Sequence, residues 1–112
     1  MKFAFEPKAS RSFGELARLN GNELQFLREL RARESVFSEL TGYGDTASDY
    51  DFRIENHKTG AGVRIQGSQP LVRLVFWSIR TTRCPEPYIR MRIEPGRQST
   101  WRIAYEFYTI PR

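Results

Sequence analysis

Apolar and polar side chains alternate along most of the second half of the sequence. Tyr50, Phe52 and Ile54 are separated by charged residues, for example, as expected of a strand with one buried face. The pattern predicts five strands in this half, at residues 50–54, 63–65, 71–79, 89–93 and 101–107. The segment 71–79 is apolar on both faces, which predicts a central strand covered on both sides.

Turn-forming residues separate these segments. Residues 56–60 have the composition of a tight turn, and Glu94-Pro95-Gly96-Arg97 places proline and glycine where a type II turn requires them. The connections are too short for crossover helices, so neighbouring strands are expected to pair antiparallel. The sequence therefore predicts a mainly β fold, an antiparallel β-sandwich or part of one.

The segment from residue 22 to residue 40 allows two interpretations. Four apolar residues recur at helical spacing, which permits one short helix near residues 23–40: Leu27, Leu30, Phe37 and Leu40. The alternation of Leu24 with Phe26, and of Val36, Ser38 and Leu40, equally permits two short extended pieces. Local pattern alone leaves both open.

The length of 112 residues fits a single domain that spans 1–112. No run of about 18 apolar residues is present, so no transmembrane helix is predicted. The first residues include Lys2 and Pro7, which do not suit the apolar core of a signal peptide. These features favour a soluble, cytoplasmic protein.

The net charge is +5, and most of the basic residues are arginines. A basic chain raises the question of a nucleic-acid partner, with Arg90, Arg92 and Arg102 on the polar face of the last hairpin. Nearly every arginine stands alone between apolar residues rather than in a tract, so nucleic acid is the less favoured partner. A structural or interaction module is a further alternative, in which strand arginines pair with acids on neighbouring strands.

The chain has one cysteine, Cys84, and one histidine, His57. These two residues cannot form an intrachain disulfide or a Cys/His zinc site of the finger type. No metal site and no cofactor are predicted.

Residues 76–88 are the distinctive segment for chemistry. Glu86 lies between Pro85 and Pro87, whose fixed φ angles give its carboxylate a defined direction, as suits a general base. Trp77 and Tyr88 offer flat aromatic faces for stacking on sugar rings, and Arg80 is a donor for sugar hydroxyls. The alternative is that the Pro-Glu-Pro run is a rigid, solvated connection.

Residues 50–110 resemble the C-terminal part of the aldose 1-epimerase (galactose mutarotase-like) family. Four motifs in sequence order carry the resemblance: Thr59-Gly60 before an apolar strand, Pro70-Leu71 before a strand ending in Phe76-Trp77, the run Cys84-Pro85-Glu86-Pro87-Tyr88, and Ile93-Glu94-Pro95-Gly96 followed by Trp101 to Phe107. Members of this family are sugar isomerases with a large antiparallel β-sandwich and a carbohydrate-binding groove.

The resemblance implies that Glu86 is the base that takes a proton from the anomeric hydroxyl, without a cofactor. The acid histidine of the family lies upstream of the matching part, and His57 matches none of its catalytic motifs. Because family members are longer chains, we expect a truncated or non-catalytic form that binds a sugar or another carbohydrate. A homo-oligomer or a complementary chain would complete the groove.

Overall fold

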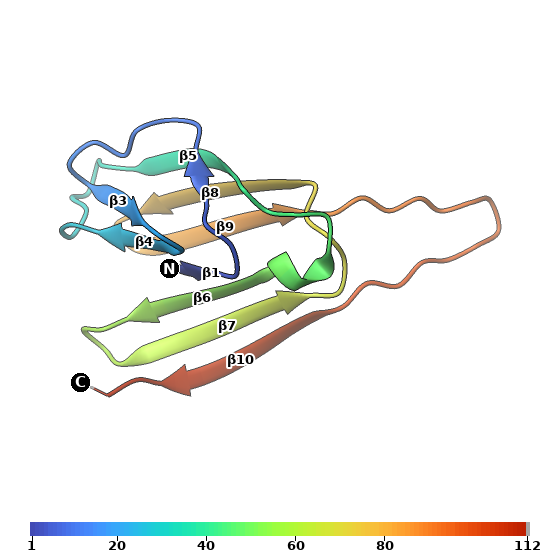
Figure 1. Cartoon of the computed structure of the whole chain (residues 1–112). Helices are drawn as coiled ribbons and strands as arrows, with labels where there is room; N and C mark the ends of the chain where they lie inside the picture. Colours follow the sequence, from blue (N-terminus) through green and yellow to red (C-terminus); the bar gives the residue numbers. More distant parts are fainter. Residues whose placement is uncertain (112) are drawn as a thin grey trace.

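The structure is a computed structural model that describes residues 1–111. Within them the chain forms ten strands and one three-residue 3₁₀ helix, η1 (Ala47–Asp49). All strand pairs are antiparallel, and the strands form two sheets that face each other (Figure 1), so the predicted antiparallel sandwich is confirmed. In the described part of the chain, no helix has the length and apolar character needed to cross a bilayer.

The first sheet has six strands, in the order β10 (Ile103–Thr109), β7 (Ala61–Gly67), β6 (Asp51–Asn56), β1 (Lys2–Phe3), β4 (Glu23–Phe26) and β3 (Ala17–Asn20). The second has four, in the order β2 (Lys8–Ala9), β5 (Val36–Thr41), β8 (Arg73–Ile79) and β9 (Thr82–Tyr88). The strands β9 and β10 are thus edge strands of different sheets.

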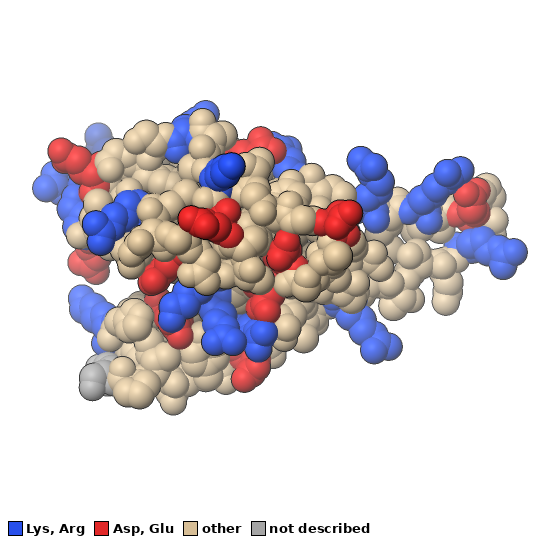
Figure 2. Space-filling model, viewed as in Figure 1, with Lys and Arg blue, Asp and Glu red and all other residues tan. Residues whose placement is uncertain are grey.

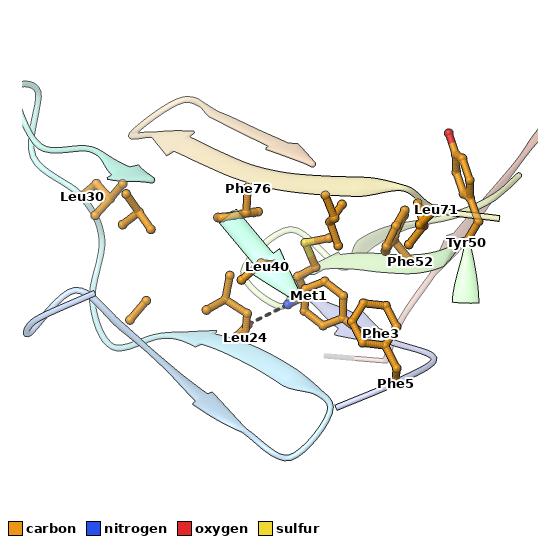
Figure 3. Close-up of a cluster of buried hydrophobic side chains, with 13 residues drawn as sticks. Met1, Phe3, Phe5, Leu24, Leu30, Leu40, Tyr50, Phe52, Leu71 and Phe76 are labelled. Atoms are coloured by element: carbon orange, nitrogen blue, oxygen red, sulfur yellow. Dashed lines mark hydrogen bonds between the residues drawn. The ribbon is translucent and has the colours of Figure 1, made fainter. Parts of the chain in front are cut away.

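The core lies between the two sheets (Figure 3). Its fully buried apolar side chains come from both sheets: Leu24, Leu40, Phe52, Leu74 and Phe76. Phe3 packs edge-to-face on Phe52, with 6.0 Å between the ring centroids. Burial of this apolar surface is the main stabilising contribution to the sandwich.

The turn predicted at residues 56–60 is confirmed, and its geometry explains the β6–β7 hairpin. The Gly60 N–H donates to the Asn56 carbonyl at 2.8 Å, and the Lys58 N–H donates to the Asn56 side-chain oxygen at 3.0 Å. Gly60 has a φ of 78°, a conformation that glycine adopts at little cost.

Of the two interpretations left open for residues 23–40, the structure confirms the two extended pieces, which are β4 and β5, and no helix forms there. In β5 the alternating Val36, Ser38 and Leu40 are buried in the core. Ser38 satisfies its hydroxyl locally by donating to the Glu39 carbonyl at 2.9 Å, and this bond makes a buried serine tolerable.

The strand predicted at residues 89–93 is also wrong. The strand that pairs with β8 is β9, which follows a two-residue turn and contains both Pro85 and Pro87. It is an edge strand, where the missing proline N–H can be accommodated. The strand β8 is central, as expected, but the other sheet covers only one of its faces.

Residues 89–102 form an arm that projects beyond both sheets and links β9 to β10 (Figure 1). The predicted type II turn at its tip is confirmed, because the Arg97 N–H donates to the Glu94 carbonyl at 3.0 Å and Gly96 has a φ of 75°. Every residue from 90 to 102 is exposed.

Candidate functional site

The outer face of the four-stranded sheet gathers aromatic, acidic and basic side chains. Alternate residues of β5, β8 and β9 point away from the core, because side chains of a strand alternate between its two faces. Eight of them form what we call the outer platform: Phe37, Glu39, Arg73, Val75, Trp77, Cys84, Glu86 and Tyr88.

The strand register orders the platform in rows. Trp77 lies between Phe37 and Cys84, and the next row places Val75 between Glu39 and Glu86. Val75 is only 3% exposed although the other sheet does not cover its face, so its neighbours on the platform shield it. The rows therefore form a packed surface rather than a set of separate side chains.

The aromatic part of the platform carries positive charge at both ends. The Arg11 guanidinium lies 5.1 Å from the ring centroid of Phe37, and the Arg73 guanidinium lies 5.3 Å from that of Tyr88. Both distances allow cation–π attraction. Trp77 is half-buried, which fixes its ring while leaving part of it accessible.

The two carboxylates of the platform lie on either side of Val75. Their strands are two inter-strand spacings apart, which separates the backbones of Glu39 and Glu86 by roughly 10 Å. The Arg73 Nε lies 3.5 Å from a Glu39 carboxylate oxygen, whereas Glu86 is exposed on the edge strand. The platform thus offers hydrogen-bond donors and acceptors beside its rings.

Three of the four residues singled out in the sequence lie together on this platform. They are Trp77, Glu86 and Tyr88. The flanking Pro85 and Pro87 pair with the core residues Phe76 and Leu74 and so point to the opposite face. The alternation of β9 therefore directs Glu86 outward.

Arg80, the fourth, is not part of the platform. It lies in the turn beyond the ends of β8 and β9. There it lines an open hollow of about 550 Å³ together with Phe26 and Arg83, and the Arg83 guanidinium lies 4.1 Å from the Phe26 ring centroid. Proximity in sequence to Trp77 did not bring it beside the ring.

His57 lies in the β6–β7 turn of the six-stranded sheet, with its side chain 73% exposed. Its Nε2 is 3.9 Å from a Glu55 oxygen, and the sandwich separates it from the outer platform. Among residues 1–111, His, Cys, Asp and Glu side chains do not gather in the groups of three that a metal ion would need.

The outer platform also contains three residues that are not among the site residues predicted from the sequence: Phe37, Glu39 and Arg73. Phe37 and Glu39 belong to the segment left open between helix and strand. The alternation of Val36, Ser38 and Leu40 is the signal that places the residues between them on the opposite face. Only the pairing of β5 with β8 shows that these residues adjoin Trp77.

Comparison of the chain with models of known protein families, with curated proteins and with solved structures found no match. The resemblance to aldose 1-epimerases therefore rests on the four motifs in the sequence.

Proposed function

We propose that this chain binds carbohydrate on the outer platform. The observation that carries the proposal is the position of Trp77, half-buried and aligned between Phe37 and Cys84, with Glu39 and Glu86 in the next row. A rigid, partly exposed aromatic ring beside carboxylates is the combination that a sugar requires.

The aromatic rings supply the apolar part of recognition. Phe37 and Tyr88 are 41% and 43% exposed and lie on the same face as Trp77. Large exposed aromatic side chains are costly to leave in water and gain free energy when another apolar surface covers them. The C–H face of a pyranose is such a surface.

The charged side chains supply the polar part. Sugar hydroxyls donate hydrogen bonds to carboxylates and accept them from guanidinium groups, and bonds with a charged partner are the stronger ones. Glu39 and Arg73 lie 3.5 Å apart and present both kinds of group at one point of the platform. Glu86 adds a second acceptor on the far side of Val75.

Anomer interconversion, which the resemblance implies for Glu86, would ask more of this residue than binding does. A sugar hydroxyl is a weak acid, so a base that deprotonates it needs to be partly desolvated. Glu86 is exposed, and His57 lies on the other sheet. We therefore propose binding as the activity of this chain by itself.

Tryptophan fluorescence tests the proposal. The chain has two tryptophans, so a Trp101→Phe background leaves Trp77 as the reporter. Titration with galactose, glucose and their oligosaccharides is expected to change its emission, with dissociation constants on the order of 1 mM for a monosaccharide. Substitution Glu39→Gln or Glu86→Gln should weaken binding in this background.

A matched pair of variants locates the binding site. Trp77→Ala should abolish binding measured by calorimetry, whereas Trp101→Ala, on the arm, should leave it unchanged. Equal binding by both variants, or a Trp77 emission that no sugar changes, would contradict the proposal. Polarimetry with α-glucose and α-galactose is the separate test of catalysis, and we expect no rate above that of the buffer from either the wild type or Glu86→Gln.

A second candidate function is favoured by the charge of the arm. Residues 89–102 hold four arginines and one glutamate, a net charge of +3 out of +5 for the whole chain. Figure 2 shows basic side chains along the projecting arm, while those on the body are interspersed with acidic ones. Trp101 adds an exposed ring to the arm, and arginines with a stacking ring are how many proteins hold single-stranded nucleic acid.

Salt dependence distinguishes this candidate from carbohydrate binding. A single-stranded oligonucleotide should bind at low salt and lose affinity steeply as salt is raised, because each neutralised phosphate releases counterions. Substituting Arg90, Arg92 and Arg97 by serine should remove this binding and leave sugar binding intact. Oligonucleotide binding that persists in the triple variant would exclude the arm as the nucleic-acid-binding surface.

A further inference from the structure

The outer strand β10 is an unprotected edge of the six-stranded sheet. Of the four edge strands within residues 1–111, β2 and β3 are short, with two and four residues, and β9 contains two prolines. Shortness and proline are the usual means by which proteins block unwanted strand pairing. The strand β10 has seven residues, without proline or lysine, and so has none of these protections.

The backbone of β10 is arranged to accept another strand. The Arg102 carbonyl accepts from the Ser68 N–H at 3.0 Å, and the Ile110 N–H donates to the Gly60 carbonyl at 2.8 Å. In an antiparallel pair such bonds recur at every second residue. The even-numbered residues therefore bond to β7, and the N–H and carbonyl groups of 103, 105, 107 and 109 face outward.

The side chains on the core-facing side of β10 are apolar and uncovered. Tyr105 pairs with Ile65 and Phe107 pairs with Val63, yet these two aromatic side chains are 58% and 79% exposed. Trp101, just before the strand, is 42% exposed. The four-stranded sheet ends at β9. Pro85 and Pro87 of that strand share a cavity with Trp101 and Tyr105, but they leave much of this apolar row exposed.

We propose that β10 pairs with β10 of a second copy of this chain, antiparallel and about a two-fold axis at Ala104. In this register Ile103 lies opposite Tyr105 of the other copy, and Trp101 lies opposite Phe107. Each contact occurs twice, as a two-fold interface requires. The two six-stranded sheets become one continuous sheet, with both apolar rows on the same face.

Charge selects this register. On the opposite face of β10, Arg102 of each copy lies across from Glu106 of the other, which gives two complementary pairs. An axis at Tyr105 would place Arg102 opposite Tyr108, and an axis at Glu106 would place the two carboxylates face to face. Glu106 lies across from Arg64 of β7, but the Arg64 guanidinium forms its close ion pair with Asp51, at 2.7 Å. Within residues 1–111 Glu106 makes no close ion pair, so Arg102 of the second copy would supply one.

Charge reversal with mixing tests the register. The full chain should show a concentration-dependent monomer–dimer equilibrium in sedimentation, and either Arg102→Glu or Glu106→Arg alone should weaken dimerisation about tenfold, because like charges then face each other twice. An equal mixture of the two variants should form a heterodimer, because both pairs become complementary again. Circular dichroism of each variant checks that the fold is retained.

Disulfide formation tests the position of the two-fold axis. Even-numbered residues form the closely spaced, non-hydrogen-bonded pairs of the new contact, so the two Ala104 Cα atoms should lie about 4.5 Å apart. In a Cys84→Ser background, Ala104→Cys should therefore form an intermolecular disulfide on mild oxidation. Gln66→Cys is the matched control, since Gln66 lies beside Ala104 on the same face but one strand further from the axis.

The outcomes are distinct. A chain that stays monomeric at every concentration overturns the proposal, as does a dimer that neither charge reversal nor Phe107→Lys weakens. Equal crosslinking of the Ala104→Cys and Gln66→Cys variants overturns the placement of the two-fold axis at Ala104. Sugar binding is independent of these results, because the outer platform lies on the other sheet.

Discussion

The Tyr108 hydroxyl donates a hydrogen bond to a Glu55 carboxylate oxygen across the width of two strands, with 2.9 Å between the oxygens. The same carboxylate lies 3.1 Å from the Lys2 ammonium group and has a side chain only 12% exposed. One acidic group thus links β10, β6 and β1 of the six-stranded sheet. Burial raises the pKa of Glu55, but the hydrogen bonds from Lys2 and Tyr108 outweigh it and leave the pKa below its ordinary value.

Tyr108→Phe removes the hydroxyl and leaves the ring. We expect a loss of about 1.5–3 kcal/mol in the free energy of unfolding, the range for a hydrogen bond to a charged group. Tyr105→Phe is the control, because the Tyr105 side chain is 58% exposed and its hydroxyl should contribute little. Urea denaturation of dilute protein measures both, and equal effects of the two substitutions would argue against the bond.

The pH dependence of this loss has a definite sign. A carboxyl group with a lowered pKa in the folded state stabilises the fold above its unfolded pKa and loses that contribution as pH falls through the folded pKa. The effect of Tyr108→Phe should therefore be largest above pH 4.5, the ordinary value for Glu55, and should shrink in more acidic buffer. An effect that grew on acidification would contradict this assignment.

Arg28 should control the ionisation of Glu34. Its guanidinium donates two hydrogen bonds to the carboxylate, at 2.7 and 2.6 Å, and with a third bond from the Arg31 N–H they lower the pKa of Glu34 to about 2. Arg28→Gln should raise this pKa towards 4.5 in an NMR titration. Arg18→Gln, another exposed arginine, should not change it, and an unmoved pKa in Arg28→Gln would show that the pair does not persist in solution.

The sequence pattern predicts strands well where one face is apolar and the other polar. The strands β6, β7 and β10 fall close to the predicted segments because their alternation is regular. The sequence pattern is less informative for β5, because the buried Ser38 interrupts its apolar positions. The pattern does not predict β9, because its two prolines argue against a strand unless its position at a sheet edge is known.

The alternation of apolar and polar residues also shows which face of a strand is apolar, but it does not show which part of the chain covers that face. The alternation of residues 101–107 predicts a strand with one buried face, but Tyr105 and Phe107 on its apolar face are 58% and 79% exposed. Their burial depends on how far the opposite sheet extends, a non-local property. The site has the same limitation, because Glu39 reaches the platform only through the pairing of β5 with β8.

Only glycine fits at position 67, because the Tyr50 ring packs directly against the backbone there. A methyl group added at this position would overlap the side chain of Tyr50, which is 2% exposed and has little room to move. We expect Gly67→Ala to destabilise the fold by about 1–3 kcal/mol in urea denaturation, as overpacking does. Gly44→Ala is the control, since its added methyl would meet only an Asp49 carboxylate oxygen, at 3.4 Å.

The role of the ring is tested by removing it. In a Tyr50→Leu background the cost of Gly67→Ala should fall, and the double-mutant cycle then gives a coupling energy between the two positions. A cost that is the same in both backgrounds would trace the effect to the backbone of β7 instead.

Two phenylalanines on the same face of the six-stranded sheet should differ strongly in the cost of the same substitution. Phe52 is 0% exposed in the core, so Phe52→Ala should cost about 3–5 kcal/mol through lost burial and the cavity left behind. Phe107 is 79% exposed, so Phe107→Ala should change the stability of the monomer by less than about 0.5 kcal/mol. Urea denaturation at low protein concentration measures both. If Phe107→Ala costs several times more at high concentration, the difference reports its burial between two copies, whereas a large cost at every concentration would place Phe107 in the core of the single chain.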